Sequence, residues 1–488
     1  MGVKGIQEIE RVKRLLYLSK YGSCQTGFLC KWNEICPSCE SSKGNGVPSL
    51  QNLSLNILAN YESFSPAMMP ISLCNVLMQV ALAKNSSTVK NFLKNWPFES
   101  FSLVNILSDH NFQCFIPWKR EQFAKKLFYS YMEIILNGEE CTLLTLDIRG
   151  TVISDEDELA KIFELLNKVR ELESNSFRQI FLDIEISEDL FDQLTSVLVY
   201  NPEINPESKS TLHVHLGHFQ SCEGSMRQGQ GIKSYLRKMI SFTTSKLESL
   251  YIPNTFLKNA GLRKILNELK MPKYQNLVAL NFANNDLDFQ SCTMTVDLFA
   301  QCIGDLPQLR SLNLSQNPVS GCLEFLLCNL KYGLLDLRVA GCELNSEDLV
   351  YLMGSIHAKS LIVLDISENS FESKTELNNF ISAFKAQMIA IEGEACGMEA
   401  DELVELATTL QDFSVLYYVS FVGYWMTIEE LVPVVRELCL CQSLKIVVLS
   451  LPVDVDFDID DVNRVKNLVS PVESVIEQCN GSFSIHWI

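Results

Sequence analysis

The chain has 488 residues, of which 47% are hydrophobic, so it can bury a large core and is not mainly disordered. Its formal net charge is −19, and the scattered charges argue against nucleic-acid binding and against electrostatic docking to an anionic membrane. Seventeen cysteines at irregular spacings indicate reduced thiols. No apolar run reaches the length of about 18–20 residues that a membrane span needs. We therefore expect a protein of the cytoplasm or the nucleus.

Residues 1–47 show little periodicity, and we expect a flexible segment there. It contains four cysteines: Cys24, Cys30, Cys36 and Cys39. The last two have the spacing of a zinc knuckle, but five residues separate the first two and no second pair with the knuckle spacing follows. Free thiols are the expectation, and a bound zinc ion is the alternative.

Residues 48–140 have the apolar spacing of helices, which predicts a helical cap on the rest of the chain. One pattern there fits the elongin-binding box, in which small, Leu, small and aliphatic residues follow at fixed spacing: Ser49, Leu50, Ser54 and Leu58. A second pattern fits the box through which some elongin-bound receptors choose cullin-2: Met69, Pro70, Leu73 and Leu77. Both would be amphipathic helices in partner grooves, with Leu50 as the anchor. Alternatively, these leucines only cap the end of the fold.

Residues 141–245 carry a degenerate repeat signal, with an isolated copy from Leu143 to Ile153. Three histidines form the best candidate for a metal site in the sequence: His213, His215 and His218. Alternation along a strand would place the first two on one face. Because no acidic fourth ligand stands nearby in sequence, we favour polar residues on a degenerate strand and expect no metal.

From residue 246 to residue 488 one pattern recurs, Leu-x-x-Leu-x-Leu-x-x-(Asn/Cys)-x-Leu, with starts 25 to 32 residues apart. The Leu-x-Leu core predicts a short strand. The Asn or Cys turns the chain, and its side chain can satisfy backbone groups that the turn leaves unpaired. In the clear copies this residue is Asn285, Asn317, Cys342, Asn369 and Cys396.

Between these strands the apolar spacing becomes helical, and Thr427 with Glu430 forms a capping box. Three helical sets are Leu349, Leu352, Met353 and Ile356; Leu403, Leu406, Ala407 and Leu410; and Leu431, Val434, Val435 and Leu438. One strand–helix unit is too small to fold alone, so neighbours must stack. The sequence thus predicts an α/β leucine-rich-repeat solenoid, a ribonuclease-inhibitor-like horseshoe with an amino-terminal helical cap.

Several short blocks resemble one family: Trp96-Pro97-Phe98, Cys342-Glu343-Leu344, Cys396-Gly397-Met398 and Leu451-Pro452-Val453. Over roughly residues 48–488 the chain resembles the PRAME family and its leucine-rich-repeat-containing protein 14 relatives. The resemblance implies a substrate-recognition subunit of a cullin-2 ubiquitin ligase with elongins B and C as adaptors, or a signalling repressor. Tyr424 and Trp425 depart from the Gly-Asn that is usual in the penultimate repeat of the family, which leaves open any shared ligand contact at that end.

The residues that flank the core leucines should point to the concave side of the solenoid. In the later repeats these are mostly acidic, with one arginine and one tyrosine: Asp336, Arg338, Asp365, Glu392, Glu394 and Tyr418. We expect these side chains to lie outside the core and to bind a partner with a basic surface, with Tyr418 as an apolar anchor. The alternative is that the carboxylates are merely solvated. The Asp-rich run 454–461 lacks the Gly and Glu of an EF-hand, so we expect an exposed acidic loop there.

Two functions follow from these patterns. The first is a substrate-recognition subunit of a cullin-2 ligase, with elongin C on the front helices and a protein substrate on the concave face. The second is a non-enzymatic scaffold or inhibitor that represses a signalling or transcription pathway by protein binding. The sequence has no phosphate loop and no nucleophile motif, so we expect no enzyme, at most a non-catalytic ligase subunit, and no cofactor.

Overall fold

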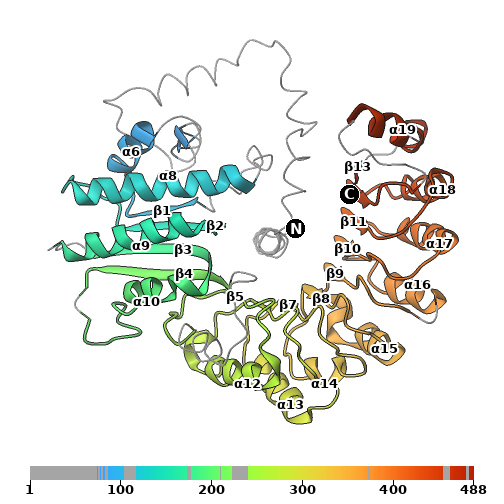
Figure 1. The fold of residues 1–488 in the computed structure, drawn as a ribbon, viewed down its shortest axis with the longest axis horizontal. Coiled ribbons are helices and arrows are strands. Elements are labelled where there is room, and N and C mark those ends of the chain that lie inside the picture. Colours follow the sequence, from blue (N-terminus) through green and yellow to red (C-terminus); the bar gives the residue numbers. More distant parts are fainter. Residues whose placement is uncertain are drawn as a thin grey trace. The chain divides into compact units, whose positions relative to one another are not determined.

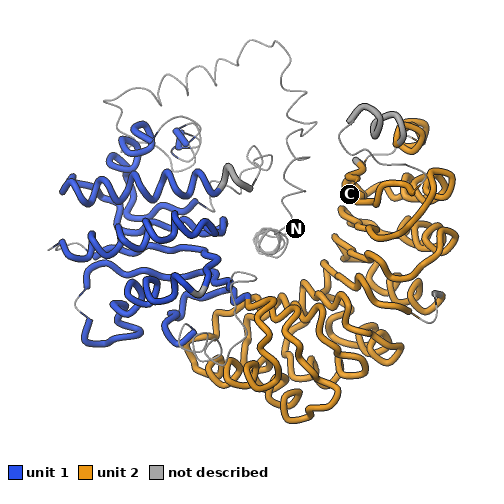
Figure 2. The backbone as a smooth tube through the Cα atoms, in the orientation of Figure 1, with its two compact units in different colours: residues 1–251 blue, residues 252–488 orange. Residues whose placement is uncertain are grey.

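The computed structural model describes residues 74, 77–78, 81–82, 86–103, 117–172, 177–208, 210–221, 240–371, 374–453, 462–479 and 483–487. The segment 1–47 with its four cysteines, the elongin-box residues from Ser49 to Leu58, and Met69, Pro70 and Leu73 lie outside these residues, as does the Asp-rich run 454–461. The chain divides into two compact units, residues 1–251 and residues 252–488 (Figure 2).

Unit 1 contains a parallel sheet whose strands follow one another in chain order. The strands are β1 (Ser100–Ser102), β2 (Thr145–Ile153), β3 (Arg178–Ile186), β4 (Leu212–Ser221) and β5 (Ser249–Tyr251). The helices are α6 (Ser86–Lys94), α8 (Pro117–Leu136), α9 (Glu156–Glu171), η4 (Glu188–Leu190) and α10 (Phe191–Leu198). The segment 48–140, which we expected to be helical, therefore also contributes a strand, β1, that pairs with β2.

The Trp96-Pro97-Phe98 block connects α6 to β1. The Trp96 ring is buried and packs edge-on against Phe101, with ring centroids 5.1 Å apart. Its indole nitrogen donates a hydrogen bond to the carbonyl oxygen of Ser100 at 3.0 Å. Thr142 donates a further bond of 2.6 Å to the carbonyl oxygen of Trp96. This block thus fixes the point at which the chain leaves the helix and enters the sheet.

Unit 2 is a stack of strand–helix repeats, with the strands along its inner side and the helices along its outer side (Figure 1). The strands are β6 (Ala279–Asn281), β7 (Ser311–Asn313), β8 (Asp336–Arg338), β9 (Val363–Asp365), β10 (Ala390–Glu392), β11 (Tyr418–Phe421), β12 (Ile446–Leu449) and β13 (Ser484–Trp487). The helices are α12 (Lys258–Leu269), η5 (Pro272–Tyr274), α13 (Thr293–Gly304), α14 (Leu323–Leu327), α15 (Ser346–Gly354), η6 (Ile356–Lys359), α16 (Lys374–Ser382), α17 (Ala400–Leu410), α18 (Ile428–Leu438) and α19 (Val462–Gln478). The strands pair in parallel, and the predicted leucine-rich-repeat solenoid is confirmed.

The repeat helices mostly follow the predicted spacing. All four apolar residues of the set in α17 and all four in α18 are buried. The capping box of Thr427 and Glu430 at the start of α18 is confirmed. In the α15 set, the helix ends at Gly354, and Ile356 is 50% exposed on η6, so its predicted core position is wrong. Within the part of the chain that the structure describes, no helix combines the length and apolarity needed to cross a membrane.

The Asn of each repeat joins two neighbouring turns. The Asn317 side-chain oxygen accepts the backbone N–H groups of Asn285 at 3.0 Å and Leu287 at 3.1 Å in the preceding repeat. The amide nitrogen of Asn317 donates to three carbonyl oxygens, those of Phe282, Leu314 and Ser315. Asn285 and Asn369 make the same kind of contacts in their own repeats. The prediction that this residue satisfies unpaired backbone groups of the turn is confirmed.

Cysteine and tyrosine replace Asn in three repeats. The Cys342 thiol lies 3.4 Å from the carbonyl oxygen of Leu314, and burial raises its pKa to about 12, so it stays protonated as a donor. At the Asn position of its repeat, the hydroxyl of Tyr424 accepts the N–H of Cys396 at 3.0 Å and donates to the carbonyl oxygen of Gly393 at 2.6 Å. An Asn contacts the equivalent two groups in the other repeats. The Tyr424 hydroxyl therefore makes the two hydrogen bonds that an Asn side chain makes in the other repeats.

Candidate protein-binding face of the repeat array

The strands of unit 2 align the residues of the predicted binding face in rows. Arg338 on β8 pairs in register with Asp365 on β9, and Asp365 pairs with Glu392 on β10. Glu392 in turn pairs with Ser420 on β11. The intervening residues Leu337, Leu364, Ile391 and Val419 form the buried row that faces the helices. Because side chains alternate along a strand, the charged row projects to the opposite side, which we call the strand face.

One arginine on the strand face lies among three carboxylates. The Arg338 guanidinium lies 3.3 Å from Glu392, 3.7 Å from Asp365 and 3.4 Å from Asp336, measured between side-chain nitrogen and oxygen. Ser311 donates a further bond of 2.8 Å to Asp336. The sequence pattern correctly predicted that these residues lie on one face of neighbouring strands.

The expectation that these side chains lie outside the core is wrong. Asp336 is 1% exposed and Arg338 is 5% exposed, while Glu392 is half-buried. The strands are so close together that the charged groups cover one another. A Lys at position 365 or 392 would therefore bury a second cation beside Arg338, and such a charge reversal should destabilise the fold.

Burial changes the protonation of the carboxylates on the strand face. It raises the pKa of Asp365 to about 7, with the negative charge of Glu392 adding to the shift and Arg338 opposing it. Burial also raises the pKa of Asp336, and Arg338 again opposes the shift. The strand face is thus a group of crowded carboxylates around one arginine. Because Asp336, Asp365 and Arg338 are buried, the half-buried Glu392 and Glu394 are the carboxylates of this face that a partner can reach.

Tyr418 and Glu394 flank the charged row. Tyr418 is half-buried, and burial followed by the nearby charge of Glu392 raises the pKa of its phenol, so it stays neutral. Ser420 donates a hydrogen bond to the Glu394 carboxylate, and the backbone N–H of Glu394 donates to the Ser367 hydroxyl at 3.0 Å. The Glu394 carboxylate is therefore held in place, and the half-buried tyrosine offers part of one ring to a partner.

The three histidines of the metal candidate lie on β4 in unit 1. The register between β3 and β4 shifts before His218, so that His215 pairs with Phe181 and His218 with Asp183 on the same face. The His213 ring contacts the carbonyl oxygen of Ser210 at 3.1 Å, and the His215 ring contacts the Thr244 hydroxyl at 3.1 Å. Burial lowers the pKa of His215 to about 4. Among the described residues, no group of His, Cys, Asp or Glu is arranged to hold a metal ion.

Sequence reasoning missed a charged cluster around Arg149 on β2. The guanidinium contacts Asp147 at 2.8 Å and Glu248 at 2.9 Å, and it lies over the Phe181 ring. A Cβ at Gly217 would overlap the Arg149 side chain, so this position on β4 requires glycine. In the sequence, the two-residue spacing of Asp147 and Arg149 indicates that both lie on one side of a strand. Glu248 and Phe181 come from distant segments, so the pattern does not indicate them as partners of Arg149.

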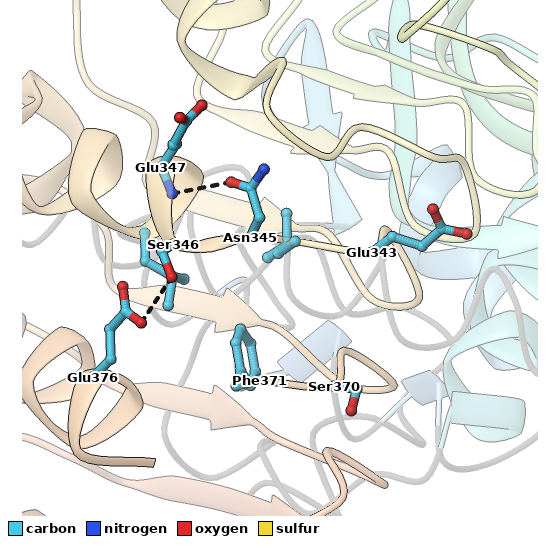
Figure 3. Close-up of a pocket in the computed structure, with 9 residues that line it drawn as sticks. Glu343, Asn345, Ser346, Glu347, Ser370, Phe371 and Glu376 are labelled. Atoms are coloured by element: carbon cyan, nitrogen blue, oxygen red, sulfur yellow. Dashed lines mark hydrogen bonds between the residues drawn. The ribbon is translucent and has the colours of Figure 1, made fainter. Parts of the chain in front are cut away.

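A pocket on unit 2 was also missed. It has a volume of about 370 Å³ and lies between the turns that follow β8 and β9 (Figure 3). Three glutamates line it together with apolar and small residues: Glu343, Glu347, Glu376, Leu344, Leu349, Phe371, Asn345, Ser346 and Ser370. Farther along the same row of turns, Trp425 is 87% exposed. Neither feature follows from the repeat pattern, because the pattern does not show how neighbouring turns meet or which turn residues stay exposed.

These features define a class: the chain is a leucine-rich-repeat protein, with stacked strand–helix units joined through their turns. No family model matches the sequence. The chain is 27% identical over 277 residues to leucine-rich-repeat-containing protein 14 of Xenopus laevis, a match that covers 56% of this chain and 53% of the frog protein. It is 30% identical over 148 residues to the Rattus norvegicus protein of the same name, covering 30% of each chain. The predicted resemblance to these relatives is confirmed, and the chain spans about half the length of the frog relative and less of the rat one.

Solved structures of repeat proteins are more distant. The leucine-rich-repeat-containing protein LegL7 of Legionella pneumophila is 15% identical with a TM-score of 0.37, and the match covers 69% of this chain and 89% of that one. The yeast Rad7 and Elc1 complex contains a chain that is 12% identical with a TM-score of 0.38, covering 86% of this chain and 96% of that one. At these values neither likeness indicates shared partners or a shared function.

Proposed function

We propose that this chain is a non-catalytic protein-binding subunit that recruits a partner with a basic surface. The strand face of unit 2 carries the proposal, because it gathers Asp336, Asp365 and Glu392 around the single guanidinium of Arg338. Crowded carboxylates favour the approach of a cationic partner and set its orientation. Tyr418 beside them is the kind of residue that contributes most of the binding energy in protein interfaces.

The finer proposal is that the chain is the substrate-recognition subunit of a cullin-2 ubiquitin ligase. Its support is the order of the two boxes, Ser49 to Leu58 for elongin C and Met69 to Leu77 for cullin-2, ahead of the repeat array. In such a subunit the front helices would hold the ligase, and the strand face would hold the protein to be modified. The resemblance to leucine-rich-repeat-containing protein 14 agrees with a repeat-based binding role and does not extend to a named partner.

One observation favours the second candidate, a scaffold or inhibitor without a ligase. Leu77, the last residue of the cullin-2 box, is 0% exposed and packs in the core of unit 1. A leucine in that position stabilises the cap and offers no surface to cullin-2. The cullin contact would then depend on Met69 and Pro70 at the other end of the box.

Recovery of elongin C with the full chain separates the two candidates. We expect wild type to recover elongin C and Leu50→Asp to lose it, because a charge in an apolar groove loses most of the docking energy. Leu50→Met is the matched control, since it keeps an apolar anchor of similar volume, and it should recover elongin C.

Failure of the wild-type chain to recover any elongin C would refute the ligase role and leave the scaffold role. Recovery of elongin C together with cullin-2 binding that survives changes at Pro70 and Leu73 would refute only the cullin assignment.

A further inference from the structure

The turns that follow strands β8 to β11 form a continuous row, which we call the loop edge: residues 341–345, 368–371, 395–399 and 423–427. Backbone hydrogen bonds join each turn to the next repeat. Gly341 donates to Ser367 at 2.8 Å, and Ala395 donates to Val422 at 2.8 Å. Because the turns are tied to one another, residues three repeats apart keep a fixed spacing along this edge.

The pocket of about 370 Å³ lies at one end of the loop edge. Figure 3 shows Phe371 between the loop that carries Glu343 and the helix that carries Glu376. Ser346 donates a hydrogen bond of 2.8 Å to Glu376, which holds that carboxylate at the pocket. An apolar floor with carboxylates at the rim suits a lysine or arginine, whose stem packs on apolar groups while its charged end meets the carboxylates.

Trp425 lies at the other end of the loop edge. The preceding residue, Tyr424, turns inward to bond Cys396 and Gly393, and Trp425 remains 87% exposed. The N–H of Val453, a residue that is 42% exposed, donates a hydrogen bond of 2.9 Å to the carbonyl oxygen of Met426, which directly follows Trp425. An exposed tryptophan beside a second apolar side chain is a surface that protein partners use as an anchor point.

The charge around this anchor is of one sign. The stretch 386–435 has no Lys, Arg or His and has nine carboxylates: Glu392, Glu394, Glu399, Asp401, Glu402, Glu405, Asp412, Glu429 and Glu430. Four of these stand in the first turns of α17 and α18, beside the loop edge. A second copy of a chain with a net charge of −19 would be repelled here, and a basic partner would be attracted.

We propose that the loop edge binds an extended basic segment of a partner protein. A Lys or Arg of that segment occupies the pocket, and an apolar side chain packs on Trp425. Two to three strand spacings of about 4.8 Å separate the pocket from Trp425, and an extended chain rises about 3.3 Å per residue, so the two side chains stand about three to four residues apart. This site is distinct from the strand face and does not depend on the ligase assignment.

Fluorescence anisotropy with the full chain tests the site. The probe is a labelled synthetic peptide of about nine residues with Arg and Phe four positions apart, so that both point to the same side of an extended chain, in a Ser/Gly background. Control peptides carry Glu in place of Arg or Ala in place of Phe. We expect the Arg–Phe peptide to bind more tightly than both controls, and more tightly at low salt than at high salt. Trp425→Ala should weaken binding of the Arg–Phe peptide about tenfold or more, and Glu376→Gln should reduce the salt dependence.

Tyr417→Ala is the matched control variant. Tyr417 is 50% exposed in the same repeat, but it precedes β11 and therefore lies at the opposite end of the strand from Trp425. Binding of the Arg–Phe peptide by this variant should equal that of wild type. Equal binding of the Arg and Glu peptides would overturn the proposal, and so would unchanged binding by Trp425→Ala.

Two other outcomes would assign the surfaces differently and also overturn the proposal. If Asp365→Asn removes peptide binding and Trp425→Ala does not, the strand face is the site for basic peptides. If sedimentation shows a dimer of wild type that Trp425→Ala dissociates, the occupant of the loop edge is a second copy of the chain.

Discussion

Replacement of Tyr424 by Phe removes one oxygen atom from a buried joint between two repeats. The hydroxyl accepts the N–H of Cys396 at 3.0 Å and donates to the carbonyl oxygen of Gly393 at 2.6 Å. The ring stays, so the variant creates almost no cavity. The change therefore isolates the hydrogen bonds by which Tyr424 replaces the asparagine of the other repeats.

The expected loss follows from what the variant leaves unpaired. Tyr424 is 5% exposed and Cys396 is 3% exposed, so water does not readily replace the hydroxyl. A buried polar group without its partner costs about 1–3 kcal/mol, and two such groups remain. We expect Tyr424→Phe to lower the free energy of unfolding of unit 2 by about 2–6 kcal/mol. Because burial raises the pKa of the phenol, this loss should not change between pH 6 and pH 8, a range of about two units near neutrality.

Chemical denaturation combined with amide hydrogen exchange would measure this loss. Exchange at the Cys396 amide reports the joint directly, whereas denaturation reports the whole unit. Tyr417→Phe is the control, since its ring is 50% exposed in the same repeat, and it should stay within about 0.5 kcal/mol of wild type. A Tyr424→Phe variant as stable as this control, with the Cys396 amide as protected as in wild type, would refute the structural role of the hydroxyl.

Two further predictions concern the strands of unit 2. Leu364 is 0% exposed in the row that faces the helices, so Leu364→Ala should cost about 2–5 kcal/mol through a cavity; a loss below about 0.5 kcal/mol in a denaturant melt would mean that this side chain does not face a packed core. Since the folded state raises the pKa of Asp365 from 3.8 to about 7, folding binds a proton between these values, and this carboxyl should lower the stability as pH rises through that window. Between melts at about pH 5 and about pH 8, Asp365→Asn should lose much of that decline in stability; an identical decline in both proteins would show that Asp365 does not cause it.

The repeat pattern predicted most of unit 2 because a leucine row and a turn residue are local requirements of each repeat. As the pattern predicts, Leu364 lies in the buried leucine row beside Leu337, and Asn317 lies in the turn and bonds its backbone. Ile356 was predicted in the core, but Gly354 ends α15 and the chain continues as η6. Helical spacing alone does not show where a helix stops, because the end depends on packing against the next repeat.

The site was less predictable than the fold for a physical reason. The row of Arg338, Asp365 and Glu392 could be listed from alternation, but their burial could not, because it arises from close packing between strands far apart in sequence. The pocket beside Glu376 and the exposure of Trp425 likewise depend on how turns from different repeats meet. Residue types on the variable positions indicate chemistry, and only the stacked structure shows which of them a partner can reach.

Tyr424 and Trp425 show how a repeat can carry an exposed aromatic residue and still keep the hydrogen bonds that join it to its neighbour. Tyr424 reaches the same two backbone groups that an asparagine contacts elsewhere, so the joint between repeats is kept. Position 425 is then not needed for this joint, so a tryptophan can occupy it with its side chain exposed. Stability therefore constrains the turn and the leucine rows, while the positions between them are free to change. A relative that is 27% identical can share the repeats and still bind something else, so the partner of this chain must be sought from its own surface residues.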